Sequence, residues 1–217
     1  MNGEVRNAKC DVLVCFAVKE EAQPFLACAA ASRVRVMVTG MGGKNAEHAF
    51  SKFLESGRPE IVLSCGFAGG LNAELTTSDV VFSIDDNFPF KSNLLVSGAK
   101  PGIFHCAKRI AISSSEKRAL RSQTGADAVE MESEVIRRMC AEQKIPSATV
   151  RVISDAANED LPLDFNQVMT AEFKISYFRL ALVVLLQPWK IPALIKFGKT
   201  TKAAAQNLSR VLKSLPI

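Results

Sequence analysis

The sequence predicts a three-layer α/β/α domain built around a mostly parallel, twisted mixed sheet. Short apolar runs rich in β-formers alternate with segments of helical spacing, which is typical of a parallel sheet covered by helices on both faces. Apolar residues make up 48% of the 217 residues, enough for a substantial core. No internal repeat, low-complexity stretch or linker divides the chain, so residues 1–217 are expected to form one domain.

The first half of the chain contains four apolar runs of strand length. Two of them lead into glycine-rich segments, which predict tight turns. A short helix is expected after residue 19, and a longer one over residues 45–56 has apolar side chains on one face. The predicted strands are residues 11–18, 34–39, 61–65 and 79–84, and the predicted turns are residues 40–43 and 66–70.

The second half is predicted to add three strands and to end in helices. Ser113 and Glu116 have the spacing of a capping box, which indicates the start of a helix. Pro188 and Pro192 interrupt the C-terminal segment, which is otherwise mostly helical from residue 165 onward. The predicted strands are residues 109–112, 128–131 and 147–153. A helix is predicted over residues 113–123, and another follows the strand 128–131 and runs to about residue 143.

Charge and composition exclude several classes of function. The net charge is +5, from 27 basic and 22 acidic residues without a basic cluster in the body of the chain, so no nucleic acid is expected as a partner. Six cysteines form no Cys-x-x-Cys pair and only two histidines are present, so no metal and no cofactor is expected. The sequence shows no secretory signal and no apolar run of membrane-spanning length, which predicts a cytoplasmic protein.

Two of the apolar runs end in acidic residues. Residues 128–133 read Ala-Val-Glu-Met-Glu-Ser, and residues 151–155 read Arg-Val-Ile-Ser-Asp. A carboxylate at the end of a buried strand is costly to desolvate unless it has a partner or a chemical role. Because ligands bind beyond the carboxyl ends of parallel strands, Glu132 and Asp155 are expected to share one pocket. That arrangement suits cleavage of a sugar–base bond, with one acid protonating the leaving base and the other gripping the sugar.

Five short motifs occur in order between residues 11 and 160. They are Ala-Val-Lys-Glu-Glu (17–21), Thr-Gly-Met-Gly-Gly-Lys-Asn-Ala (39–46), Gly-Phe-Ala-Gly-Gly-Leu (66–71), Val-Glu-Met-Glu (129–132) and Arg-Val-Ile-Ser-Asp (151–155). Neither glycine segment fits a Walker P-loop or the dinucleotide-binding G-x-G-x-x-G pattern. In this order and spacing the motifs resemble the nucleoside phosphorylase/nucleosidase superfamily, in its purine nucleoside phosphorylase-like branch. The resemblance implies the phosphorylase/hydrolase-like form of the α/β/α fold.

The resemblance implies that Asp155 is the general acid, which gives a proton to the imidazole-side nitrogen of a purine. An acid with that role must be protonated near neutral pH. Ser154 and Arg151 would hold this carboxyl group or its strand. Glu132 would accept hydrogen bonds from both ribose hydroxyls, and Met131 would pack against the ribose or the base. The structural alternatives are a cap for Asp155, a helix N-terminal charge for Glu132 and a core position for Met131.

The resemblance also implies substrate-binding roles for Glu130 and for Phe67, Ala68 and Gly69 of the second glycine turn. Backbone in such a turn can approach a sugar or a phosphate closely. Glycines also serve tight turns without any ligand, and Glu130 stays open between substrate binding and a structural role.

Glu21 discriminates between two chemistries. In the hydrolytic branch of the superfamily the matching glutamate binds the attacking water, whereas a bare carboxylate repels the phosphate that a phosphorylase uses. Glu21 is therefore predicted to be catalytic and favours hydrolysis; phosphate is the co-substrate in the alternative case. Its structural alternative is the favourable position of an acid at the start of a helix.

Three features of the sequence depart from the pattern of the hydrolytic relatives. Phe67 stands where hydrolytic relatives often carry a small hydroxyl residue, and residues 113–117 replace the aromatic residue that covers the base in methylthioadenosine nucleosidases. Residues 180–194 resemble the tail of hopanoid-associated phosphorylases, which act on an adenosine attached to a triterpenoid. The basic, aromatic-containing C-terminal helices suit peripheral membrane contact, with packing on the sheet as the alternative.

The resulting hypothesis is cleavage of the N-glycosidic bond of an adenine-type purine nucleoside by water or phosphate. The substrate could carry a large apolar 5′-substituent, as in adenosylhopane. A methylthioadenosine/S-adenosylhomocysteine-type nucleosidase is the alternative within the superfamily, and a non-catalytic nucleoside- or lipid-binding protein is the alternative from another class. A homo-oligomer, such as a dimer, is expected because superfamily pockets are often completed by a partner chain.

Overall fold

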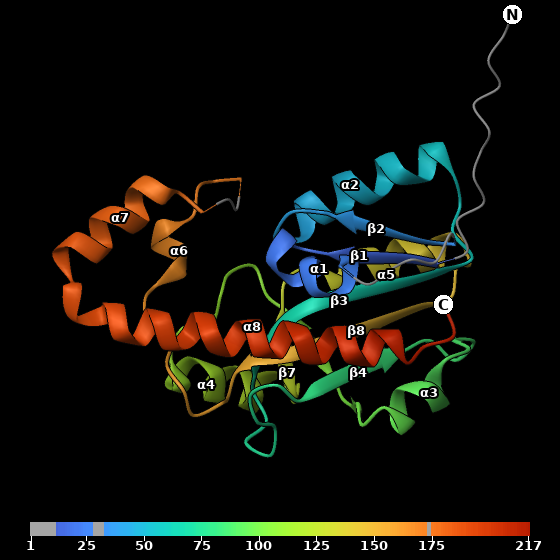
Figure 1. The fold of residues 1–217 in the computed structure, drawn as a ribbon. Helices are drawn as coiled ribbons and strands as arrows, with labels where there is room; N and C mark the ends of the chain where they lie inside the picture. Colours follow the sequence, from blue (N-terminus) through green and yellow to red (C-terminus); the bar gives the residue numbers. More distant parts are fainter. Residues whose placement is uncertain (1–11, 28–32, 173–174) are drawn as a thin grey trace, which may run out of the picture.

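The computed structural model describes residues 12–27, 33–172 and 175–217, and these form one mixed sheet with helices on both faces (Figure 1). The eight strands are β1 (Val12–Phe16), β2 (Val34–Val38), β3 (Ile61–Gly70), β4 (Val80–Ile84), β5 (Lys100–Pro101), β6 (Phe104–Cys106), β7 (Ala128–Glu130) and β8 (Ser147–Asp155). The predicted three-layer α/β/α fold with a mixed, mostly parallel sheet is confirmed. That residues 1–217 form a single domain stays a prediction.

The two longest strands, β3 and β8, form the centre of the sheet. The strand order is β2-β1-β3-β8-β4-β5, and β7 pairs with β3 and β6. Every residue of β8 is buried, including the charged Arg151 and Asp155, which therefore need partners inside the protein. β1, β2, β3 and β8 run parallel, so their carboxyl ends meet at one edge, whereas β4 is antiparallel to β8 and β7 is antiparallel to β3.

The helices bury their apolar faces on opposite sides of this sheet. They are α1 (Lys19–Leu26), α2 (Gly43–Ser56), α3 (Lys91–Val96), α4 (Ser114–Thr124), α5 (Ser133–Glu142), α6 (Phe165–Val168), α7 (Tyr177–Leu186) and α8 (Ile191–Lys213), with a 3-10 turn η1 (Pro188–Lys190) before α8. Phe50 of α2 and Ile136 of α5 pack in one core cluster. Phe25 of α1 and Leu208 of α8 pack in the cluster on the other face.

Two expectations about local structure are wrong. Residues 109–112 are not a strand, because the side-chain amide of Asn166 pairs with both the N–H and the C=O of Ile110 and so replaces a strand partner. The neighbouring strand is β6, which the sequence did not reveal. Residues 66–70 are not a turn but the last half of β3, with an irregular register against β8 between Ala68 and Gly69.

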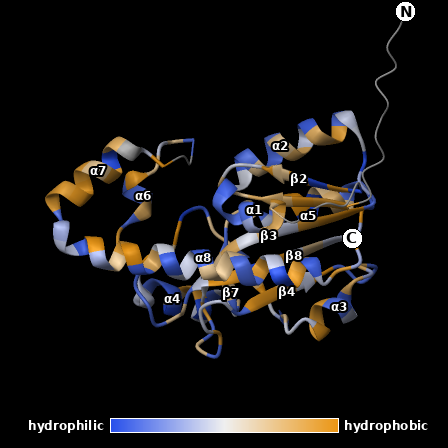
Figure 2. Cartoon of the chain, in the orientation of Figure 1, coloured by the Kyte–Doolittle hydropathy of each residue, from blue (hydrophilic) through white to orange (hydrophobic). Residues whose placement is uncertain are grey.

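The C-terminal helices leave the body of the molecule and return to it. α6 and α7 project to one side, and the long helix α8 leads back to pack on the sheet (Figure 1). Figure 2 shows that α7 is hydrophobic along nearly its whole length. No single helix of the described chain meets the length and hydropathy required to cross a membrane; residues 178–186 and 188–213 meet them only as a pair, bent by 101°.

Candidate active site

A pocket of about 250 Å³ lies at the sheet edge where β1, β3 and β8 end. Every predicted site residue except Arg151 lines it. They are Glu21, Phe67, Ala68, Gly69, Glu130, Met131, Glu132, Ser154 and Asp155. The pocket therefore brings together residues that are up to 134 positions apart in the chain.

Glu132 reaches the pocket by a different route from the one expected. β7 runs antiparallel to β3, so the Glu130–Glu132 segment does not follow a strand parallel to β8. It enters the pocket because β3 pairs with β7 along its extended last part, at Gly69 and Gly70. The two acids, Glu132 and Asp155, nevertheless line the same pocket.

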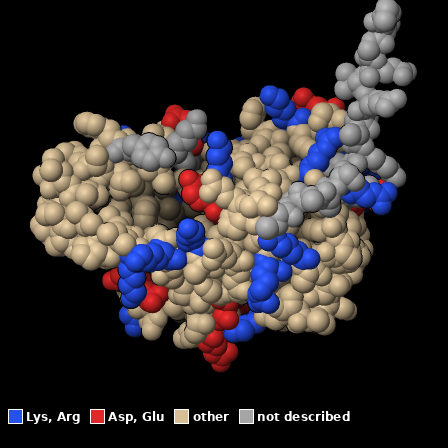
Figure 3. Space-filling model, viewed as in Figure 1, with Lys and Arg blue, Asp and Glu red and all other residues tan. Residues whose placement is uncertain are grey.

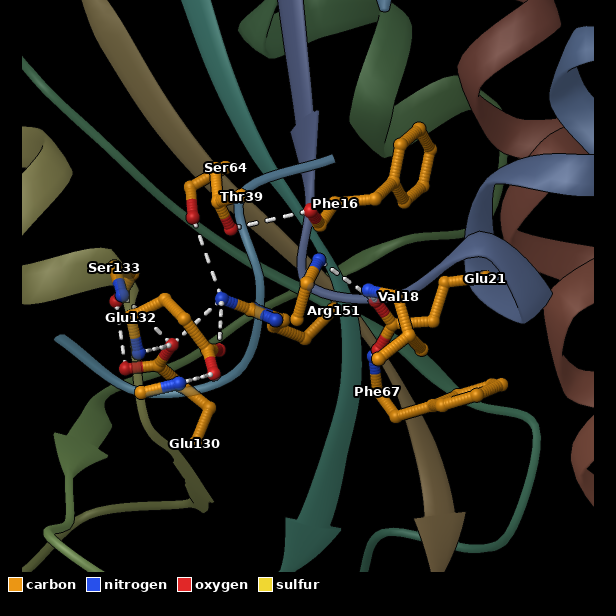
Figure 4. Close-up of polar contacts among 12 residues, drawn as sticks. Phe16, Val18, Glu21, Thr39, Ser64, Phe67, Glu130, Glu132, Ser133 and Arg151 are labelled. Carbon is orange, nitrogen blue, oxygen red and sulfur yellow. Dashed lines mark hydrogen bonds and ion pairs between the residues drawn. The ribbon is translucent and has the colours of Figure 1, made fainter. Parts of the chain in front are cut away.

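Arg151 lies buried beneath the pocket and joins its acids (Figure 4). Its Nη2 donates to Glu130 Oε2 at 2.6 Å, to Glu132 Oε2 at 3.2 Å and to Ser64 Oγ at 3.3 Å. Arg151 therefore holds Glu130 and Glu132 rather than Asp155. The reason is distance along β8, since Asp155 lies four residues after Arg151, roughly 13 Å along an extended strand.

Glu130 has the contacts of a structural residue. Its carboxylate accepts from the backbone N–H groups of Glu132 (2.9 Å) and Ser133 (2.8 Å) and from the Ser133 hydroxyl (2.9 Å), in addition to Arg151. These bonds fix the connection between β7 and α5. Glu130 thereby orients Glu132, the next acid along the chain.

Glu132 is a fixed acceptor with an unusual protonation equilibrium. Its Oε1 accepts from the Gly42 N–H at 2.8 Å, just before α2 begins, and its Oε2 faces Arg151. Burial raises the pKa of Glu132 to about 7, although the Arg151 guanidinium opposes that shift. An acceptor held at both oxygens is pre-oriented for a pair of hydroxyl groups.

Glu21 closes the other side of the pocket with three backbone bonds. Its Oε2 accepts from the N–H groups of Ala17 (2.9 Å) and Val18 (3.1 Å), and its Oε1 accepts from the N–H of Phe67 (2.8 Å). Burial raises the pKa of Glu21, and Arg151 again opposes the shift. Both the cap of α1 and the wall of the pocket use this carboxylate, so the two interpretations of Glu21 are compatible.

Gly66 permits this close approach between β3 and the carboxylate. Its φ is +145°, and a Cβ placed there would lie 2.7 Å from both Glu21 Oε1 and Arg151 Nη1. Any side chain would displace one of the two charged groups.

Asp155 contacts a hydroxyl group and a buried lysine. Ser154 Oγ donates to Asp155 Oδ1 at 2.5 Å and lies 3.3 Å from the carbonyl of Ala68. The ammonium group of Lys117 forms an ion pair with Asp155 Oδ2 and donates at 2.8 Å to the carbonyls of Ala156 and Glu159. The group beside the acid is thus a cation.

Sequence reasoning missed Lys117 and the outer pocket wall. Lys117 is fully buried in α4, but a single lysine among the polar residues of residues 114–118 gives no sign that it points inward. The outer wall is apolar and consists of Leu161, Phe165, Ile175 and Phe197, which come from segments on either side of α7. The sequence shows that these residues are aromatic or aliphatic, but it does not predict that they meet at the pocket.

The comparison with known families decides the classification. The sequence profile described as the phosphorylase superfamily matches residues 18–96 and 97–182. The chain belongs to the phosphorylase superfamily. This confirms the resemblance drawn from the five motifs; the affinity to the hopanoid-associated subgroup stays a prediction.

Relatives within the superfamily are named for nucleoside cleavage. The 5′-methylthioadenosine/S-adenosylhomocysteine nucleosidase of Glaesserella parasuis serovar 5 (strain SH0165) is 26% identical over 171 residues, 63% of this chain and 74% of that protein. The nucleosidase of the same name from Shewanella halifaxensis (strain HAW-EB4) is 26% identical over 168 residues, 62% of this chain and 73% of the relative.

Solved structures share the superfamily fold at lower identity. The futalosine hydrolase of Helicobacter pylori strain 26695 has a TM-score of 0.68 at 17% identity, covering 95% of this chain and 97% of that one. The H. pylori 5′-methylthioadenosine/S-adenosylhomocysteine nucleosidase with butyl-thio-DADMe-Immucillin-A has a TM-score of 0.69 at 16% identity, with the same coverage.

Within the described residues of this superfamily member, no group of three or more His, Cys, Asp and Glu side chains is arranged to hold a metal ion. Three of the described cysteines, Cys65, Cys106 and Cys140, are free thiols. Cys10 and Cys28 lie outside the described residues.

Proposed function

We propose that this protein is an enzyme that cleaves the N-glycosidic bond of an adenine-type purine nucleoside. The observation that carries the proposal is that Asp155, at the end of β8, and Glu132, at the start of α5, line one pocket. The names of the relatives support it, since they are nucleosidases. Two acids in one pocket allow one to act on the base and the other on the sugar.

Asp155 is the group that protonates the base in this proposal. The electron pair of the bond between the sugar and the base leaves with the purine. The proton shared by the Lys117 ammonium group and Asp155 Oδ2 passes through Asp155 to the imidazole-side nitrogen and neutralises the base. Ser154 fixes one carboxyl oxygen of Asp155, and Lys117 fixes the other. Both supports come from buried side chains, which keeps the carboxyl group in one orientation.

Glu132 is the group that binds the sugar. When ionised it accepts hydrogen bonds from both ribose hydroxyls, and its charge stabilises the positive sugar that forms as the base departs. Met131, also in the pocket wall, provides apolar contact beside it. Phe67, Ala68 and Gly69 form the wall along β3.

Water is the nucleophile that the surroundings of Glu21 favour. Three backbone N–H groups that would otherwise be available to an anion already donate to the Glu21 carboxylate. A phosphate ion at this position would lose those donors and meet a negative charge. Phosphorolysis, with phosphate as co-substrate, remains the alternative reaction.

The apolar outer wall favours a nucleoside with an apolar 5′-substituent. Phe165 and Phe197 lie with ring centroids 5.6 Å apart, and Ile175 and Leu161 extend the same wall. These four side chains give no partner to a charged amino-acid group, and Arg109, which also lines the pocket, is already paired with Glu116. The wall instead contacts a thioalkyl group or a longer hydrocarbon, as in adenosylhopane. The methylthioadenosine/S-adenosylhomocysteine nucleosidase activity of the relatives is the alternative.

Adenine release from a panel of nucleosides, with and without phosphate, tests the proposal. The expected result is release without phosphate, faster for apolar 5′-substituents, and slower by ~10²–10⁴-fold in Asp155→Asn. Stimulation by phosphate would establish a phosphorylase. Binding of nucleosides without release would favour the non-catalytic alternative. Assembly into a dimer and a cytoplasmic location stay predictions.

A further inference from the structure

The helix α7 is apolar on every side and yet not buried. Its sequence is Tyr-Phe-Arg-Leu-Ala-Leu-Val-Val-Leu-Leu, with Arg179 as its one charged residue. None of the described residues between 170 and 203 is buried. A helix that is hydrophobic all round normally lies in a protein core or in lipid. The surface of α7 therefore fits an apolar environment that the chain itself does not provide.

The apolar surface continues from α7 across η1 into the first turns of α8. We call residues 175–200 the C-terminal arm. Its exposed side chains include Phe178 (79%), Leu182 (46%), Leu185 (77%), Leu186 (63%), Trp189 (70%), Ile191 (39%) and Ile195 (54%). Figure 3 shows the projecting part of the molecule almost free of charged atoms, with a hollow between it and the body. A continuous exposed patch of this kind marks an interaction surface.

Charge selects the partner of the arm. Residues 173–217 contain eight Lys or Arg residues and no Asp or Glu, whereas the rest of the chain has more acidic than basic residues. Lys190, Lys196 and Lys199 belong to the arm itself. A second copy of this chain in a two-fold contact would set the same basic residues against one another. An anionic lipid surface provides both the apolar layer and the opposite charge.

Neither α7 alone nor a straight helix of the arm crosses a bilayer. α7 has 10 residues, about 15 Å of helix, against a hydrocarbon layer of about 30 Å. The chain bends by 101° between α7 and α8. Trp189 lies in the 3-10 turn at this bend, and tryptophan favours the boundary between headgroups and hydrocarbon.

We propose that the C-terminal arm docks on an anionic membrane surface, with α7 and the bend at Trp189 inserted among the lipids and Lys196 and Lys199 at the headgroups. The inference goes beyond the proposed reaction and does not depend on it. Ile175 and Phe197 also line the pocket, so the arm that meets the lipid is the outer wall of the same pocket. Docking thus places the pocket wall beside the hydrocarbon layer.

The single tryptophan of the chain reports directly on docking. The full chain is mixed with vesicles of phosphatidylcholine alone or with phosphatidylglycerol, and flotation and Trp189 fluorescence are measured. The expected result is flotation and a blue-shifted emission with the anionic vesicles only. Absence of flotation with anionic vesicles would overturn the proposal, and equal binding to both kinds would overturn its electrostatic part.

Matched variants separate the arm from the rest of the surface. Leu185→Glu should weaken vesicle binding by about 100-fold, from the loss of one buried leucine. Val96→Glu changes an 88% exposed residue of α3 in the same way and should leave binding unchanged. Equal loss in both variants would contradict docking through the arm.

Neutralised lysines test the charge. Lys196→Gln/Lys199→Gln should weaken binding to anionic vesicles roughly 30-fold, since each basic residue near the surface contributes about five-fold. Lys52→Gln/Lys91→Gln makes the same charge change on α2 and α3 and should have little effect. A blue-shifted Trp189 in buffer without lipid, together with self-association that Leu185→Glu abolishes, would show that a second copy covers the arm and would overturn the proposal.

Discussion

Replacing Lys117 with Met should lower the free energy of unfolding by about 3–5 kcal/mol, because it leaves Asp155 as a buried carboxylate without its cation. Lys117 is fully buried and Asp155 is only 6% exposed, so water cannot replace the lost ammonium group. Ser154 then remains as the hydrogen-bond donor to this carboxylate.

Asp155→Asn should cost less, about 1.5–3 kcal/mol, the value of one charge-assisted hydrogen bond. The reason is that Lys117 keeps its bonds to the carbonyls of Ala156 and Glu159. The double variant Lys117→Met/Asp155→Asn removes both charges together. Its loss of unfolding free energy should therefore be smaller than the sum of the two single losses by at least about 2 kcal/mol.

Urea denaturation of the four proteins at neutral pH measures this coupling, provided that the slopes with denaturant agree. Lys100 and Asp79 form a control pair at the surface, with side chains 49% and 21% exposed. The same cycle there should give no more than about 1 kcal/mol. A coupling within about 0.5 kcal/mol of zero at Lys117 and Asp155 would refute the view that this ion pair holds the acid.

Two further predictions concern Glu132 and Gly66. Burial raises the pKa of Glu132 to about 7, so ionisation of this group costs stability. Relative to Glu132→Gln, the wild type should lose up to about 3 kcal/mol of unfolding free energy as the pH rises from about 4.5 through 7, while nucleoside binding strengthens over the same range. Unfolding and binding measured over the same pH series would show whether the two trends are opposed. Gly66→Ala should lower the free energy of unfolding by about 3 kcal/mol and displace Glu21. The control is Gly98→Ala, which is also at positive φ but has nothing within 4 Å of the position that a Cβ would take, and it should cost about 1 kcal/mol. Thermal unfolding measures both, and equal losses would contradict the close approach at Gly66.

The positions of Glu21 and Asp155 were predictable from the sequence because each follows an apolar run. Parallel strands end at one edge of the sheet, so acids just beyond them meet without any knowledge of strand order. Glu132 also reaches the predicted pocket, but through β7, whose antiparallel pairing with β3 was not expected. The Val-Glu-Met-Glu motif was enough to identify Glu132 as a site residue. The direction of β7 could not be predicted, because it depends on pairing with Gly69 and Gly70.

The remaining features depend on partners that are distant in the chain. Ile110 is held by Asn166, 56 positions later, so the apolar run around it forms no strand. Lys117 points inward because Asp155 and the carbonyls of Ala156 and Glu159 are there to receive it. Local periodicity contains none of this information, since one polar residue in a polar turn of helix looks the same whether it faces water or a buried acid.

The balance of buried charge around the pocket bears on the choice between water and phosphate. The acidic and basic residues concerned are all less than 7% exposed. They are Glu21, Glu130, Glu132 and Asp155, against Arg151 and Lys117. Carboxyl groups thus outnumber cations. Glu132, at the proposed sugar position, and Glu21, at the proposed nucleophile position, both lie near the single guanidinium of Arg151. A sugar that becomes positive as the base leaves is stabilised by this excess, and its approach in turn favours the ionised form of Glu132. A phosphate ion would meet the same excess as repulsion in a site with little water to screen it. The charges therefore favour capture of the sugar by a neutral nucleophile, which is water.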